Sequence, residues 1–195
     1  PRADSREAAG ERALDLANAG PDTVLAFFDG QAPTSVQGVI ALAGALEQTG
    51  RGDEARPLIR NWWRTQSFDA APQGRILSRW SRWLTQADHE ARLDLLLLGP
   101  HGPATREMIT LVSPERRAVA EAVLALRTAY NGDSLVAGLT PAQARDPAVV
   151  LERVRLLRAA GRQTEGFALL SALPRAPSHG DGQSALWSER RNYFL

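Results

Sequence analysis

The sequence predicts an all-α fold, a right-handed α-superhelix of antiparallel helical hairpins. Ala (32 residues), Leu (26) and Arg (23) dominate the composition, whereas Val and Ile together contribute only 14 of the 195 residues. Ala, Leu and Arg favour helices, and β-branched residues favour strands. In addition, helical hairpins with a Gly-centred turn recur along the chain. Because one hairpin cannot bury its apolar face alone, such hairpins stack, as in tetratricopeptide-like solenoids.

Start and stop residues divide the chain into helices in order. Gly20-Pro21 ends the first helix, Asp53 and Asp88 are N-cap residues, and Pro114 occupies a first-turn position. Residues 135–146 form a short, broken segment, and residues 174–183 resemble a linker because they are rich in Pro, Ser and Gly. Residues 1–195 are otherwise expected to form a single domain. The predicted helices are 6–19, 22–28, 36–48, 53–63, 72–84, 88–98, 104–111, 114–130, 147–160, 163–173 and a last one from about Ser184.

Two of the predicted hairpins align with each other when Gly50 is set over Gly161. Both share a helix, a turn centred on Gly, an acidic residue near the next helix start and an apolar pair. The spacing between hairpins is irregular, which indicates a degenerate array. The matched positions are Leu46 with Leu157, Arg51 with Arg162, Glu54 with Glu165, Leu58 with Leu169 and Ile59 with Leu170.

Charge and cysteine content exclude several classes of function. The 23 basic residues are all Arg, and 22 acidic residues interspersed with them leave a net charge of +1. A dedicated nucleic-acid binder shows a clustered basic face, so no nucleic-acid partner is expected. The absence of Cys excludes disulfides, thiolate catalysis and Cys-ligated metals. The longest apolar run, Val39 to Leu46, is far shorter than the ~20 residues of a membrane span.

No catalytic motif is found in the sequence. It lacks the zinc-protease, nucleophile-elbow, phosphate-loop and dinucleotide-binding patterns. We therefore expect no catalytic residue, no cofactor and no metal site. His89 is expected at an exposed helix start and His101 in an exposed loop.

The five Trp residues are the remaining candidates for function. Trp62 and Trp80 are expected to fill gaps between stacked hairpins. Trp63 and Trp83 are the candidates for contact with a glycan, since aromatic rings stack on sugars.

Several segments match a known family in order. They are residues 88–97 (Asp-His-Glu-Ala-Arg-Leu-Asp, then Leu-Leu), residues 108–127 (a Met, Leu-Val, a Pro and an Ala/Arg/Glu-rich helix), residues 151–162 and residues 187–191 (Trp-Ser-Glu-Arg-Arg). From roughly Ala43 onward the chain resembles the helical, U-shaped region of soluble lytic murein transglycosylases. Ser188 stands where the family has a second Trp.

The resemblance implies a non-catalytic superhelical portion of a periplasmic enzyme that degrades peptidoglycan. Its partners would be peptidoglycan glycan strands and the catalytic domain of the same protein. In the family the catalytic Glu lies in a Glu-Ser pair on a lysozyme-like domain; this chain has no Glu-Ser pair, and its one Met is Met108. The alternative is a stand-alone tetratricopeptide-like scaffold that binds a protein or peptide. The sequence begins with a polar segment and no signal peptide, which fits a cytosolic protein and also an exported protein after signal removal; the resemblance favours the periplasm.

Overall fold

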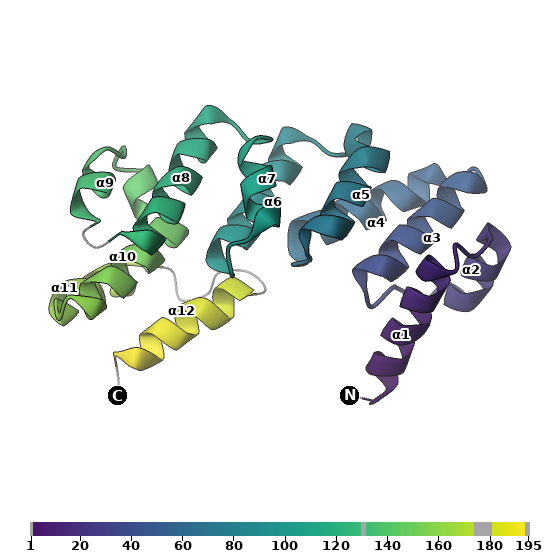
Figure 1. Cartoon of the computed structure of the whole chain (residues 1–195), viewed down its shortest axis with the longest axis horizontal. Coiled ribbons are helices and arrows are strands. Elements are labelled where there is room, and N and C mark those ends of the chain that lie inside the picture. Colours follow the sequence, from purple (N-terminus) through teal and green to yellow (C-terminus); the bar gives the residue numbers. More distant parts are fainter. Residues whose placement is uncertain (1, 130–131, 174–180, 194–195) are drawn as a thin grey trace. The chain divides into compact units, whose positions relative to one another are not determined.

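The chain is helical throughout the residues that the structure describes (Figure 1). The structure is a computed structural model that describes residues 2–129, 132–173 and 181–193. Within these ranges the chain forms α-helices and two short 3-10 helices, and no strand. The prediction of an all-α fold is confirmed, whereas the superhelical winding and the single domain over residues 1–195 stay predictions.

The helices belong to two compact units, residues 1–88 and residues 89–195. The first unit contains α1 (Arg2–Leu16), α2 (Pro21–Phe28), α3 (Val36–Gln48), α4 (Gly52–Thr65), α5 (Ala70–Trp80), η1 (Ser81–Trp83) and the first residues of α6 (Gln86–Leu98). The second contains the rest of α6, α7 (Pro103–Ile109), α8 (Pro114–Thr128), α9 (Asp133–Ala137), η2 (Gln143–Arg145), α10 (Pro147–Ala159), α11 (Gln163–Ser171) and α12 (Asp181–Asn192).

Helix α12 begins three residues before the predicted start at Ser184. The expected linker over residues 174–183 therefore overlaps the first turn of this helix. Residues 174–180 of that linker lie outside the described ranges.

The start of α3 is held by a buried carboxylate from α1. Glu11 is 2% exposed and accepts hydrogen bonds from the amides of Thr34 and Ser35, both at 2.7 Å, and from their hydroxyls. Ser35 in turn caps the helix by accepting from the amide of Gly38 at 3.1 Å. A Cβ at position 38 would overlap the Glu11 carboxylate, so Gly38 leaves room for this carboxylate at the start of α3.

The two aligned hairpins, α3–α4 and α10–α11, have the same turn. Gly50 (φ 78°) and Gly161 (φ 74°) both adopt the left-handed conformation that favours glycine. The next amide bonds back across the helix end: Arg51 N to Leu46 O at 2.7 Å, and Arg162 N to Leu157 O at 2.8 Å. This is the hydrogen bond of the Schellman helix ending.

The first residue after each glycine also makes the same ion pair. Arg51 holds Glu54 through two hydrogen bonds of 2.7 and 2.8 Å, and Arg162 holds Glu165 through two of 2.8 and 2.7 Å. Helices α3 and α10 both have 13 residues, and their N-cap side chains, Ser35 and Asp146, both accept a backbone hydrogen bond. The repeat that the sequence predicts at Gly50 and Gly161 is therefore present in the structure.

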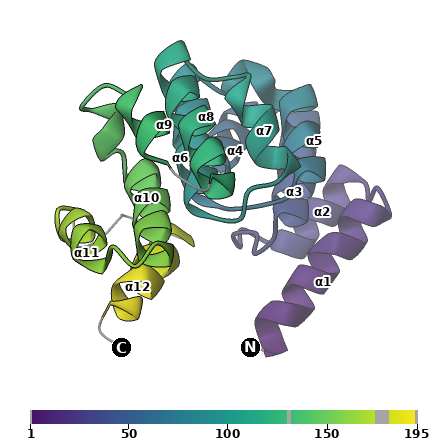
Figure 2. The ribbon, with the colours of Figure 1, turned by 60° about the vertical axis from the view of Figure 1, so that its left-hand side comes forward.

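The correspondence extends beyond the hairpins to five helices in each unit. In the first unit α3 contacts α1, α2, α4 and α5; in the second, α10 contacts α8, α11 and α12, and the packing of α2 against α3 has no equally close counterpart at α9. Figure 2 shows α10 with α8, α11 and α12 around it. The order α1 to α5 thus matches the order α8 to α12, and the third helix is the central one in each. Near its middle the fifth helix buries an apolar residue, Ile76 in α5 and Leu186 in α12.

The turn geometry yields a paired stability prediction. Gly50→Ala should lower the free energy of unfolding by about 1 kcal/mol, because L-residues are strained at this φ. Gly74→Ala, inside α5, should raise it by about 0.5–1 kcal/mol, because an added Cβ there meets nothing within 4 Å and alanine favours the helix. Urea denaturation of the two variants measures both changes, and an equal loss from both would contradict the role of the turn.

Candidate functional site

The positions of Trp63 and Trp83 in the structure do not suit contact with a glycan. Trp63 is 0% exposed and Trp83 is 9% exposed, so neither presents a ring face on which a sugar could stack. The assignment of these two residues as glycan contacts is therefore corrected: they are core residues of the first unit. Trp80 is 0% exposed, as expected of a residue that fills the interior, whereas Trp62 is only half-buried.

The tryptophan with the most open ring is Trp187 on α12, which is 62% exposed. The guanidinium of Arg191 lies over this ring, 5.2 Å from its centroid. The sequence did not distinguish Trp187 as exposed, because the residues that cover or uncover it belong to other segments of the chain.

Two tryptophans and two arginines form a stack where α5 meets η1. The rings of Trp80 and Trp83 are nearly parallel, with centroids 5.9 Å apart. Arg79 lies over Trp80 and Arg82 over Trp83, at 4.9 and 5.2 Å from the ring centroids. Cation–π contacts of this kind hold the arginines in place.

Glu47 at the end of α3 accepts hydrogen bonds from this stack. Nε1 of Trp80 and Nε of Arg79 both lie 3.0 Å from its Oε2, and Arg82 binds Oε1. Burial alone would raise the pKa of Glu47, but these three hydrogen bonds outweigh it and hold the pKa below the usual value. The carboxylate therefore stays charged and ties α3 to α5.

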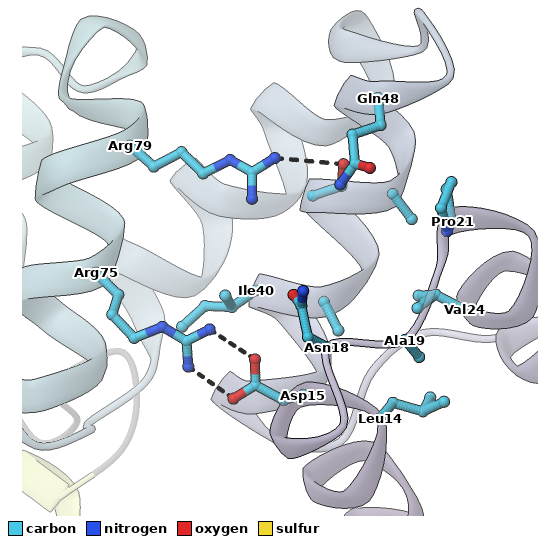
Figure 3. A pocket seen from close by; sticks show the side chains of 13 residues that line it. Leu14, Asp15, Asn18, Ala19, Pro21, Val24, Ile40, Gln48, Arg75 and Arg79 are labelled. Carbon is cyan, nitrogen blue, oxygen red and sulfur yellow. Dashed lines mark hydrogen bonds and ion pairs between the residues drawn. The ribbon is translucent and has the colours of Figure 1, made fainter.

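Next to Glu47 a groove opens between α1, α2, α3 and α5 (Figure 3). Its open volume is about 400 Å³, part of which is continuous with solvent. Apolar side chains of Leu14, Val24 and Ile40 line the inner part. Polar side chains line the rim, and Arg75 and Arg79 both reach it from α5.

Hydrogen bonds hold the two arginines at the rim of the groove. Both terminal nitrogens of Arg75 donate to the Asp15 carboxylate at 2.6 Å, and this hydrogen-bonded pair raises the pKa of Arg75. Arg79 donates to the carbonyl of Gly44 at 3.5 Å. A Cβ at position 44 would lie 3.0 Å from Arg79, so Gly44 leaves room for the guanidinium. The residues lining the groove include no His, Ser or Tyr, and its charged groups are Asp15, Arg75 and Arg79.

A second groove lies in the other unit, beside the end of α6. It has an open volume of about 690 Å³ and is lined by Leu98, Gly99, Pro100, Arg127, Arg155 and Ala185. Arg127 donates to the buried carboxylate of Glu152 at 2.7 Å, and Arg155 binds the same oxygen. His101, expected to be exposed, is half-buried nearby, with its Nε2 2.9 Å from the carbonyl of Leu97. Burial lowers the pKa of His101.

Buried carboxylates elsewhere are also bound by arginine. Asp88 has a 0% exposed side chain; Arg60 holds it through two hydrogen bonds of 2.9 and 3.1 Å, and Thr85 adds two of 2.8 Å. Burial would raise the pKa of Asp88, but these hydrogen bonds outweigh it and lower the pKa. Glu189 is held by Arg158 at 3.2 and 3.1 Å.

The chain was compared with protein-family models, with curated proteins and with solved structures. None matches.

Among the described residues, no helix is long and apolar enough to cross a membrane. In the same residues no group of three or more His, Asp or Glu side chains is placed to hold a metal ion. Neither finding assigns a function. The features that bear on function are the two grooves and the ion pairs that join the helices.

The burial of the tryptophans predicts a difference between two variants. Trp80→Ala should cost about 3–5 kcal/mol of stability, because it leaves a cavity and removes a donor from Glu47. Trp62→Ala should cost roughly 1–2 kcal/mol, because its ring is only half-buried. Chemical denaturation measures both, and equal losses would show that Trp80 is not the buried ring.

The low pKa of Asp88 predicts a pH dependence of stability. Its folded-state pKa lies below its unfolded-state value, so its contribution is fully present above about pH 4 and is lost as the pH falls through the folded-state pKa. Asp88→Asn should destabilise the chain at pH 7 and flatten the loss of stability between pH 5 and pH 2. Denaturation at several pH values tests this. The matched control is Asp53→Asn, whose side chain is 99% exposed and which should leave the pH profile unchanged.

Proposed function

We propose that this chain is the non-catalytic superhelical portion of a periplasmic peptidoglycan lytic transglycosylase. In this role its stacked hairpins would support the catalytic domain and engage glycan strands. One observation carries the proposal: the residues that give the sequence its resemblance to that family are the same residues that join the helices in the structure.

The first matching segment, residues 88–97, illustrates this. Asp88 is fully buried on Arg60 and Thr85. Arg92 is 0% exposed, and burial lowers its pKa to about 9, still high enough for it to be charged at pH 7. Leu93 and Leu97 are also 0% exposed. The motif therefore specifies how this helix packs.

The later matching segments join helices in the same way. Arg127 on α8 binds Glu152 on α10, and Arg158 on α10 binds Glu189 on α12. All four residues lie in the segments that resemble the family. A shared set of packing residues supports a shared helical framework, and a framework of hairpins is what the superhelical region of such an enzyme requires.

The buried acids of the later matching segments take part in packing. Glu152 and Glu189 are each ion-paired with two arginines, and these pairs join neighbouring helices. The proposed role is therefore support and binding, with the chemistry on a lysozyme-like domain of the same protein.

The two arginine-lined grooves favour a second candidate function, a stand-alone scaffold that binds a protein or peptide. Both grooves offer the hydrogen-bond donors of two arginines among their lining residues. A scaffold of this kind would use the same hairpins without any relation to peptidoglycan.

Purified murein sacculi distinguish the two functions. We expect the chain to sediment with sacculi and to release no anhydromuropeptides. The folded chain centrifuged without sacculi controls for sedimentation by aggregation. A folded chain that does not sediment would contradict the transglycosylase proposal and favour the scaffold. Release of products that one Glu→Gln change abolishes would show that the chain is itself catalytic.

A further inference from the structure

The two grooves occupy equivalent places in the two five-helix units. The first is bordered by α1, α3 and α5 together with α2; the second by α8, α10 and α12 together with the end of α6. Under the correspondence of α1–α5 with α8–α12, both therefore lie between the first, third and fifth helices of their unit. Each contains two arginines in its lining.

An ion pair between the third and fifth helices lies beside each groove, with its charges exchanged. In the first unit Glu47 is on the third helix and Arg79 on the fifth; their Nε to Oε2 distance is 3.0 Å. In the second unit Arg158 is on the third helix and Glu189 on the fifth, and the same two atom types lie 3.2 Å apart. Glu47 and Arg158 are both the penultimate residues of their 13-residue helices.

One arginine of the groove lining also changes helix between the units: it lies on the fifth helix in the first unit and on the third helix in the second. In the first unit the third helix has Gly44 and the fifth has Arg75; at the matching positions the second unit has Arg155 on the third helix and Ala185 on the fifth. Arg75 and Ala185 each lie four residues before the fifth-helix member of the ion pair. At these matched positions, each groove therefore has one arginine and one small residue in its lining, and the two exchange helices between the units.

The charge balance around the grooves is also the same. In the first unit Arg75, Arg79 and Arg82 pair with Asp15 and Glu47. In the second, Arg127, Arg155 and Arg158 pair with Glu152 and Glu189. Each cluster therefore has three arginines for two carboxylates and an excess of one positive charge.

The positive groups are the ones that face solvent. The arginine side chains are 42–62% exposed in the first cluster and 30–38% exposed in the second. The carboxylates behind them are 11% and 24% exposed in the first, and 3% and 7% in the second. A guanidinium has five N–H donors, and Asp15 uses only the two terminal nitrogens of Arg75, so donors remain for a ligand.

We propose that the groove between the first, third and fifth helices of each unit binds a carboxylate, so that the chain carries the same site twice. A single excess charge matches a monoanion, and the guanidinium fork matches the two oxygens of a carboxylate, as Asp15 on Arg75 already shows. This inference rests on the proposed function for the identity of its ligand, the carboxylates of the peptides that peptidoglycan carries on its glycan strands.

The sites are tested by titrating the full chain with acetyl-alanyl-alanine, which has one free carboxylate. The readout is the Nε–H NMR signals of the arginines, assigned from the variants. We expect the signals of Arg75 and Arg155 both to shift with ligand. Arg75→Gln should weaken binding at the first groove about tenfold and leave the second unchanged, and Arg155→Gln should do the reverse. Each variant is thus the control for the other.

Further arms separate the alternatives. Arg56→Gln removes an exposed charge outside both grooves and should not alter binding; an equal effect would indicate a general charge effect and overturn the proposal. The C-terminal amide of the peptide should not bind, and inorganic phosphate should bind more weakly than the free peptide. Equal binding of phosphate would overturn the assignment to a carboxylate. If Arg155→Gln does not fold, Arg155→Lys, which retains the charge but not the fork, replaces it.

The outcome is independent of the test with sacculi. In one outcome the chain sediments with sacculi, Arg75→Gln and Arg155→Gln do not change this, and the peptide shifts no arginine signal. This outcome would overturn the carboxylate sites and retain the proposed function. Binding of the peptide without sedimentation would retain the sites and contradict the proposed function.

Discussion

In each unit an ion pair joins the third and fifth helices. In the first unit the third helix contacts the other four helices, and in the second it contacts the first, fourth and fifth, so its position determines where the others pack. In the first unit the tie is Glu47 with Arg79, and in the second Arg158 with Glu189. Exposed ion pairs contribute little, but removing one partner of a largely buried pair leaves an uncompensated charge and costs about 3–5 kcal/mol. Glu189, with a 7% exposed side chain, is of the second kind.

The exclusive use of arginine fits this arrangement. Arginine holds a carboxylate through two parallel hydrogen bonds and stacks on aromatic faces, which lysine does less well. Both properties meet at Arg79, which lies over Trp80 and binds the same carboxylate as the Trp80 ring nitrogen. The aromatic ring, the arginine and the acid are therefore one packing element.

Most of the secondary structure could be predicted from the sequence because its signals are local. Pro at the first turn and Gly at a left-handed helix end act within a few residues. The predicted N-cap residues Asp53 and Asp88 marked the correct helix starts to within two residues, although both lie inside the first turn. The repeat at Gly50 and Gly161 was visible for the same reason. The wider match of five helices was not, because the ion pair that identifies it has its charges exchanged and so leaves no common residue in the sequence.

The site residues were harder to predict because burial is decided by distant segments. Adjacent Trp62 and Trp63 were assigned the wrong way round, although a signal was present. Ala55, Ile59 and Trp63 are spaced four residues apart and share a helix face, and all three are 0% exposed. Asp88 shows the opposite limit: as an N-cap candidate it resembles a surface residue, and its charge is neutralised in the interior by Arg60, which lies 28 positions away in the sequence.

The exchange of charges between the two units has a consequence for both stability and binding. An ion pair has the same Coulomb energy whichever helix carries the acid, so the exchange preserves the tie between the helices. It does not preserve the groove wall, because the small residue and the long arginine also change helices: Gly44 and Arg75 in one unit, Ala185 and Arg155 in the other. Each groove thus keeps the same excess charge while the direction from which its guanidinium approaches is reversed. Two grooves built in this way would share a preference for a carboxylate and differ in how they orient the rest of the molecule that carries it.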